Sequence, residues 1–215
     1  MRPRVKICCI ANLEEMRLAV RYGAAAVGLV SAMPSGPGVI ADELIAEVAA
    51  EVPPGVASFL LTCRTEVEEI VAQQRRLGVN TLQLCDRLTR GTHRELKRAL
   101  PGVAVVQVIH VRGDESVAEA LRVAPSVDAL LLDSGNQQLA VKELGGTGRT
   151  HDWALSRRIV EQAGVPVFLA GGLQAENVRA ACARVGPFGV DVCSGVRTGG
   201  QLDEGKLAAF FAQLN

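Results

Sequence analysis

The sequence predicts a single α/β domain over residues 1–215, folded as a (β/α)8 barrel of the TIM type. Three observations carry this prediction. Short apolar runs alternate with helix-like segments eight times along the chain, as in successive βαβ units. The runs are almost continuously apolar, which is typical of parallel strands that are buried on both faces. The 215 residues can bury one sizeable core, although the chain is short for this barrel.

A doubly wound open sheet is the alternative that the same alternation allows. Such a sheet often carries a Gly-x-Gly-x-x-Gly turn after its first strand, or a Walker phosphate loop. The sequence contains neither motif at the corresponding place. The closed barrel is therefore the preferred interpretation.

Each expected strand is a short apolar run, often β-branched and bounded by Gly, Pro or polar residues. In chain order, the strands are expected at residues 5–10, 25–31, 57–62, 81–85, 104–111, 128–134, 166–171 and 189–195.

Capping and stop signals delimit the helices between these strands. Asn12 and Thr65 are each followed three residues later by Glu, which is the spacing of an N-terminal capping box. Gly23 and Gly78 are placed to end the first and third helices. In chain order, the helices are expected at residues 12–22, 42–51, 65–77, 92–100, 114–123, 152–163, 176–185 and 203–213.

Composition argues against several classes of function. Lys and Arg total 23 against 23 Asp and Glu, and aromatic residues make up 3% of the chain. Nucleic acid is therefore not an expected partner, because a basic surface and stacking platforms are both missing. No apolar run reaches the ~18 residues of a membrane span, and the N-terminus has no apolar signal segment.

The cysteines are expected to be free thiols in a cytoplasmic protein, because they lie in apolar segments and no secretion signal precedes them. Their spacing matches no Cys-x-x-Cys zinc pattern, so neither a metal nor a cofactor is expected. The six are Cys8, Cys9, Cys63, Cys85, Cys182 and Cys193.

Polar residues at the ends of the expected strands are the candidates for chemistry, because a barrel of this type carries its site at the strand C-termini. Side chains alternate along a strand, so Lys6 and Cys8 should share one face and Cys9 should take the other. A lysine inside an apolar strand must be paired or functional. Asp133 follows three leucines, where a carboxylate acts as an acid or base or caps its loop.

Glycine clusters follow the last three expected strands and point to a phosphate site. Glycine lets backbone N–H groups approach an anion closely, and the late loops of such barrels often bind phosphate. The candidate phosphate-binding residues are Gly146, Thr147, Gly148, Gly171, Gly172, Ser194 and Gly195.

Several motifs occur together, in order, over nearly the whole chain. They are Val5-Lys6-Ile7-Cys8, Gln83-Leu84, Leu131-Leu132-Asp133, Gly145-Gly146-Thr147-Gly148-Arg149 with Asp152-Trp153, Leu169-Ala170-Gly171-Gly172-Leu173 with Glu176-Asn177-Val178, and Asp191-Val192-Cys193-Ser194-Gly195-Val196. In combination they resemble the phosphoribosylanthranilate isomerase family of tryptophan biosynthesis.

The resemblance implies an Amadori rearrangement, in which an aminoaldose 5-phosphate opens its ring and becomes the aminoketose. It implies that Cys8 removes the C2 proton as general base and that Asp133 protonates the ring oxygen as general acid. A cation at Lys6 would favour the thiolate form of Cys8. Lys6, Gln83 and Arg197 are further candidates for contact with a phosphosugar substrate, and the protein is expected to be a monomer or a homodimer.

The chain departs from the family pattern in the half that would hold the anthranilate. Cys9 replaces a Gly, Cys85-Asp86 replaces His-Gly, and Arg197 replaces a Glu. Gly38 stands where the family's carboxylate-binding Arg is expected, so Gly38→Arg is expected to improve turnover unless Arg197 or Arg149 holds the carboxylate.

Two other interpretations therefore stay open beside an isomerase of this family. One is an isomerase of the same mechanism that acts on another phosphosugar. The other is a non-catalytic barrel that binds a phosphate ligand, although the presence of both Cys8 and Asp133 argues against it.

Overall fold

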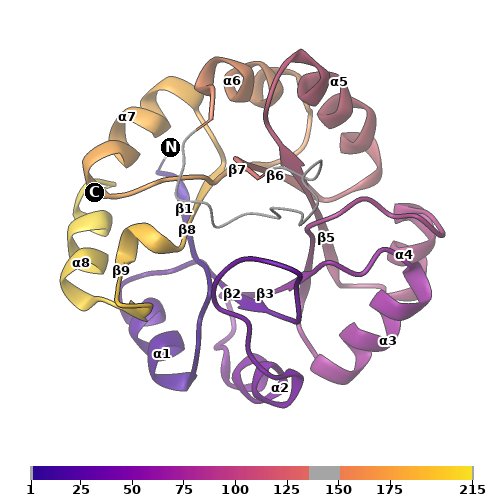
Figure 1. Ribbon diagram of the computed structural model, residues 1–215, viewed down its shortest axis with the longest axis horizontal. Coiled ribbons are helices and arrows are strands. Elements are labelled where there is room, and N and C mark those ends of the chain that lie inside the picture. The colour runs from indigo at the N-terminus through magenta and orange to yellow at the C-terminus, as the bar shows by residue number, and fades with distance from the viewer. Residues whose placement is uncertain (1, 136–150, 215) are drawn as a thin grey trace.

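A computed structural model describes residues 2–135 and 151–214, and in it eight parallel strands close into a barrel (Figure 1). Each strand pairs with the next along the chain, and the first pairs with the eighth. The closed barrel that the sequence predicts is thus confirmed. The strands are β1 (Arg4–Ile7), β2 (Ala26–Val30), β3 (Ala57–Thr62), β4 (Thr81–Leu84), β5 (Ala104–His110), β6 (Ala129–Asp133), β7 (Val167–Leu169) and β8 (Gly189–Val192).

Helices form a ring around the barrel and cover the outer faces of the strands (Figure 1). Their buried stripes pack against the strands in one large apolar layer. They are α1 (Leu13–Arg21), α2 (Asp42–Glu51), α3 (Val67–Leu77), α4 (His93–Ala99), α5 (Asp114–Val123), α6 (Trp153–Gln162), α7 (Ala175–Val185) and α8 (Glu204–Ala212). None of the helices in the described part of the chain is long and apolar enough to cross a bilayer.

A second, smaller apolar cluster fills the inside of the barrel. The rings of Phe59 and Phe168 meet edge to face, with their centroids 5.9 Å apart. Val106 and Leu131 are part of the same buried cluster. The barrel is therefore a packed core rather than a pore.

Most helix boundaries match the expected ones to within a residue or two, but one of the two predicted helix caps differs from the structure. Asn12 caps α1 by accepting from the amide of Glu15, as expected. Thr65 does not cap α3, because its hydroxyl instead bonds to that of Thr89 and Glu66 occupies the capping position without a side-chain bond. The contact between Thr65 and Thr89, 24 residues apart, thus takes the place of the expected helix cap.

The first and last strands are shorter than the apolar runs that predict them. β1 ends at Ile7 rather than at residue 10, and β8 ends at Val192 rather than at residue 195. Ser194–Val196 forms a single 3-10 turn, followed by the small hairpin of β9 (Arg197–Thr198) and β10 (Gln201–Leu202). The alternation of side chains therefore stops before Cys9, which adopts a left-handed conformation with φ of 62°.

Candidate active site

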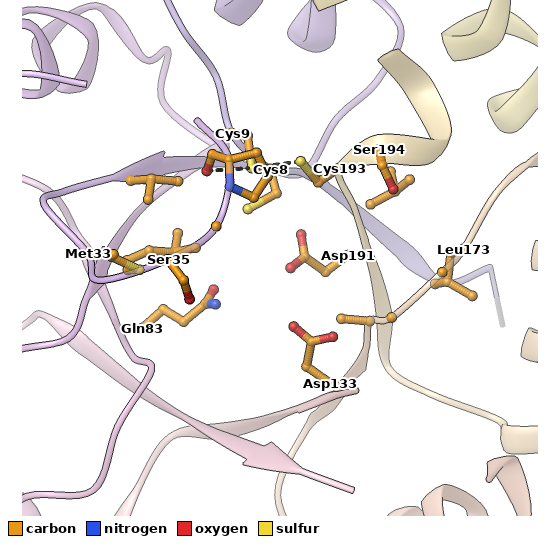
Figure 2. Close-up of a pocket in the computed structure, with 18 residues that line it drawn as sticks. Cys8, Cys9, Met33, Ser35, Gln83, Asp133, Leu173, Asp191, Cys193 and Ser194 are labelled. Carbon is orange, nitrogen blue, oxygen red and sulfur yellow. Dashed lines mark hydrogen bonds between the residues drawn. The ribbon is translucent and has the colours of Figure 1, made fainter. Parts of the chain in front are cut away.

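A pocket opens at the C-terminal ends of the strands, where this barrel class carries its chemistry (Figure 2). Residues at or just after the ends of β1, β2, β7 and β8 line it, together with Leu61 of β3, Gln83 of β4 and Asp133 of β6. Several sequence-predicted site residues thus meet in one cavity. Those that line it are Cys8, Gln83, Asp133, Gly171, Gly172 and Ser194.

Cys8 is held at the wall of this pocket by the backbone on both sides. Its amide donates to the carbonyl of Val192 at 2.8 Å, which ties it to the end of β8. Its own carbonyl accepts from the guanidinium of Arg197 at 3.2 Å. The side chain is buried and directed into the pocket (Figure 2). A thiol in this position can exchange a proton with a ligand bound in the pocket.

Asp133 faces the same space from the opposite side of the pocket (Figure 2). The carboxylate follows the apolar end of β6 and accepts from the amide of Ser134 at 2.7 Å. Burial raises the pKa of Asp133, and this effect outweighs the Ser134 hydrogen bond and the nearby His110 that act to lower it. A neutral carboxyl is therefore easier to maintain here than in water, which suits a proton donor.

Lys6 lies deeper in the barrel and is fully buried. Its ammonium donates to Asp191 Oδ1 at 2.8 Å and lies 5.3 Å from the ring centroid of Phe59. Burial acts to lower the pKa of Lys6, but Asp191 and then Cys8 outweigh it, so the pKa is raised and the side chain stays a cation. The lysine is thus paired, and it adds positive charge beneath the pocket.

Lys6 of β1 and Cys8, which follows β1, lie on the same side of the chain, as the strand alternation predicts. A Cβ placed on Gly28 would come within 2.9 Å of Cys8 Sγ and 3.0 Å of Lys6 Nζ. The two side chains therefore pack over the same glycine of β2, and any larger residue there would displace them.

Asp191 is a site residue to which sequence reasoning assigned no role. It lies directly opposite Lys6 in the β1–β8 register and lines the pocket beside Asp133. A signal was present, because an aspartate inside the apolar β8 run raises the same question of pairing as a lysine inside β1. Only the closure of the barrel brings the two charges together.

Gln83 presents a hydrogen-bond acceptor with no partner among the described residues. The side chain is 4% exposed, and its Oε1 atom accepts no hydrogen bond. Because buried polar atoms are usually satisfied, this atom is available to a donor on a bound ligand.

Two of the glycine clusters come together at one corner of the pocket. Gly171 and Gly172 have φ of 84° and 62°, which side chains rarely adopt. A Cβ on Gly195 would lie 2.0 Å from the carbonyl oxygen of Leu173, so only glycine lets the β8 loop approach the β7 loop this closely. Ser194, the neighbour of Gly195 in the chain, lines the pocket. The third cluster, with Gly146, Thr147 and Gly148, and the neighbouring Arg149, lies outside the described residues.

Arg197 does not line the pocket. Its guanidinium is buried, bonds to both carboxylate oxygens of Glu15 at 3.0 and 2.9 Å, and also donates to the carbonyls of Cys8 and Gly200. Burial acts to raise the pKa of Glu15, but the hydrogen bonds from Arg197 and from two backbone amides outweigh it and lower that pKa. The structure thus places Arg197 as support for the backbone behind Cys8.

Gly38 cannot take an arginine in this structure. Its φ is 81°, and a Cβ there would lie 2.4 Å from the Cβ of Cys9. The expectation that Gly38→Arg improves turnover is therefore not supported, because any side chain would displace the loop or Cys9. None of the described residues that line the pocket is Arg or Lys.

Cys9 is directed differently from the sequence prediction. It was expected on the opposite face from Cys8, toward the helices, but it belongs to the inner cluster and lines the pocket. The left-handed conformation after the end of β1 is the physical reason. All six cysteines are free, and no group of His, Cys, Asp and Glu in the described ranges could hold a metal ion.

Comparison with known proteins relates this geometry to one family. The family model described as N-(5'-phosphoribosyl)anthranilate (PRA) isomerase matches residues 5–213. N-(5'-phosphoribosyl)anthranilate isomerase 2 of Methanosarcina mazei is 36% identical over 210 residues, which cover 96% of this chain and 92% of that protein.

Solved structures agree with the sequence matches. The phosphoribosyl anthranilate isomerase of Thermotoga maritima has a TM-score of 0.80 at 31% identity, with 99% of this chain and 98% of that chain covered. A phosphoribosyl anthranilate isomerase in complex with reduced 1-(o-carboxyphenylamino)-1-deoxyribulose 5-phosphate has a TM-score of 0.78 at 29% identity, with the same coverage.

Proposed function

The chain belongs to the N-(5'-phosphoribosyl)anthranilate isomerase family, and we propose that Cys8 and Asp133 are the general base and general acid of its reaction. The protein is an intramolecular aldose–ketose isomerase of tryptophan biosynthesis. Its substrate is N-(5'-phosphoribosyl)anthranilate, which it converts to the aminoketose phosphate. The observation that carries the assignment of roles is that Cys8 and Asp133 face one pocket from opposite sides.

The reaction requires two proton transfers on opposite sides of the sugar. Protonated Asp133 gives its proton to the ring oxygen, and the ring opens as the C1–O bond breaks to leave a C1=N iminium. The Cys8 thiolate takes the proton from C2, the C–H electrons form the C1=C2 bond, and the C1=N electrons return to the nitrogen to give an enolamine. The enolamine becomes the ketone when C1 gains a proton and the C2 hydroxyl loses its proton. Positioned groups of this kind each contribute about 10²–10⁴-fold to the rate.

Three other features support the binding of a phosphosugar. The left-handed backbone at Gly171 and Gly172 and the close approach of Gly195 to Leu173, beside Ser194, suit a phosphate group. The free Oε1 of Gln83 can accept from a sugar hydroxyl or from the amine. Lys6 does not line the pocket, but its ammonium group adds a positive charge next to Cys8 and Asp191.

The test is the kinetics of single variants in each role. Cys8→Ala and Asp133→Asn should each lower kcat for N-(5'-phosphoribosyl)anthranilate by about 10²–10⁴-fold with little change in KM. The reaction is monitored through the loss of substrate fluorescence. Cys63→Ala is the matched control, because Cys63 is a cysteine near the same end of the barrel that does not line the pocket. Unchanged turnover in either variant would remove that residue from the mechanism.

We also propose that the protein acts in the cytoplasm on a small phosphosugar, as a monomer or homodimer, without a nucleic-acid or membrane partner. The six free cysteines support a reducing compartment. Fractionation of cells and light scattering of the purified protein check the two statements separately.

A further inference from the structure

Two thiols meet at the mouth of the pocket, and the isomerase mechanism uses neither of them. Cys9 follows β1 and Cys193 follows β8, 184 residues later in the chain, yet their sulfur atoms lie 2.7 Å apart (Figure 2). Both residues line the pocket. Cys9 is the direct neighbour of Cys8, and Cys193 is the direct neighbour of Ser194.

The backbone holds this pair in place. Cys9 has a φ of 62°, and the absence of a side chain at Gly38 leaves room for its Cβ. On the other side, pairing of β1 with β8 sets the separation of the two chain segments, and the amide of Cys8 donates to Val192 at 2.8 Å. The backbone therefore places the two sulfur atoms next to each other, and no long flexible side chain is needed to bring them together.

The two thiols differ in access and in acidity. Cys9 is buried, whereas Cys193 is partly exposed. The hydrogen bond between the thiols lowers the pKa of Cys193 more than burial raises it, and the Arg197 guanidinium adds to the lowering. The same contact and burial raise the pKa of Cys9. An accessible thiol with a lowered pKa beside a second thiol is the usual arrangement of a redox-sensitive pair.

We propose that Cys9 and Cys193 form a reversible disulfide across the mouth of the pocket, and that this disulfide lowers turnover. The oxidant is a low-molecular-weight disulfide. The Cys193 thiolate attacks one of its sulfurs, forms a mixed disulfide and releases one small thiol. Cys9 then loses its proton, attacks Cys193 Sγ and releases the second small thiol. The protein gives up two electrons and two protons, and the small disulfide becomes two thiols.

The expected loss of activity follows from the position of the bond. A disulfide brings two sulfurs to about 2.05 Å, so the segments after β1 and β8 must move toward each other from the present 2.7 Å. Cys8 and Ser194 are attached to those segments. A misplacement of about 1 Å can cost on the order of 10²-fold in rate. We expect kcat/KM to fall by about tenfold to a hundredfold. This expected loss rests on the proposed catalytic role of Cys8.

Peptide mapping after oxidation tests the bond itself, independently of activity. Trypsin places Cys8 and Cys9 in one peptide, residues 7–17, and Cys193 in another, residues 185–197. After treatment with oxidised glutathione, mass spectrometry should find these two peptides linked and released by dithiothreitol. The link should persist in Cys8→Ala and disappear in Cys9→Ala and in Cys193→Ser. A link that needs Cys8, or no link at all, overturns the proposal even if Cys8 and Asp133 prove catalytic.

Activity of the same samples tests the consequence. Each variant is compared with its own reduced form. The wild type and the control Cys182→Ser, whose cysteine lies on α7 away from the pocket, should lose kcat/KM on oxidation and recover it with dithiothreitol. Cys9→Ala and Cys193→Ser should keep their reduced activity. An equal loss in these two variants would mean that oxidation acts elsewhere, and a linked protein with unaltered kcat/KM would also contradict the switch.

Discussion

At the residue scale, burial favours the neutral form of the Asp133 carboxyl group, which its proposed role as general acid requires. Burial raises its pKa, while His110 is among the groups that lower it. A general acid works only when protonated, so activity should fall as the pH rises through the pKa of Asp133. His110→Gln removes a lowering influence and should move this limb of the kcat/KM profile to higher pH. His93→Gln, on α4, is the control and should leave the limb in place. A limb that moves to lower pH in His110→Gln would contradict this account.

Gly38 and Cys9 form a second residue-scale pair, in which the absence of one side chain makes room for another. Gly38→Ala should destabilise the protein because its Cβ would lie 2.4 Å from that of Cys9. Gly55→Ala has a comparable φ of 91° but open space around it, so it measures the backbone strain alone. Chemical denaturation should show the larger loss for Gly38→Ala. In a Cys9→Gly background, the additional loss of unfolding free energy in Gly38→Ala relative to Gly55→Ala should become smaller. If it does not, the contact with Cys9 is not the cause of that loss.

At the element scale, the seam between β1 and β8 closes the barrel and carries a buried charge pair. Lys6 and Asp191 are register partners and lie 2.8 Å apart. Removing one partner of such a pair typically costs about 3–5 kcal/mol, because the other charge stays buried without compensation. Asp191→Asn should therefore lower the unfolding free energy by that amount in urea titrations. The double variant Lys6→Met, Asp191→Asn should recover part of the loss, and a double variant less stable than Asp191→Asn would argue against this explanation.

At the scale of the whole molecule, the closed barrel brings the two ends of the described chain together. Arg2 Nε donates to the carbonyl of Leu214 at 2.9 Å. A circular permutant that joins these ends, with new termini at the exposed turn of Gly102, should fold and keep kcat/KM within a few-fold, since this turn precedes β5 and lies away from the site. New termini at Gly38, beside Cys9, should abolish most activity. Equal activity of the two permutants would show that the Gly38 loop has no part in the site.

The order of the elements and half of the site could be predicted from sequence because their signals are local. An apolar run reports a buried strand whatever it pairs with, and the strand alternation alone puts Lys6 and Cys8 on one face. Asp133, Gly171 and Gly172 can be placed at the pocket from sequence because each ends an apolar run. Their roles, and a phosphate contact at Gly195, stay predictions. Gly146, Thr147 and Gly148 stay a prediction, since they lie outside the described residues.

The partners of the charged and reactive side chains were decided only by the tertiary structure. Barrel closure sets Lys6 against Asp191, turns Arg197 toward Glu15 instead of a ligand, and brings Cys193 to Cys9. None of these pairs has a local signal, because their members lie more than 180 residues apart. The pattern of apolar residues specifies which residues are buried, but the register of β1 on β8 and the left-handed turn at Cys9 determine what each buried group meets.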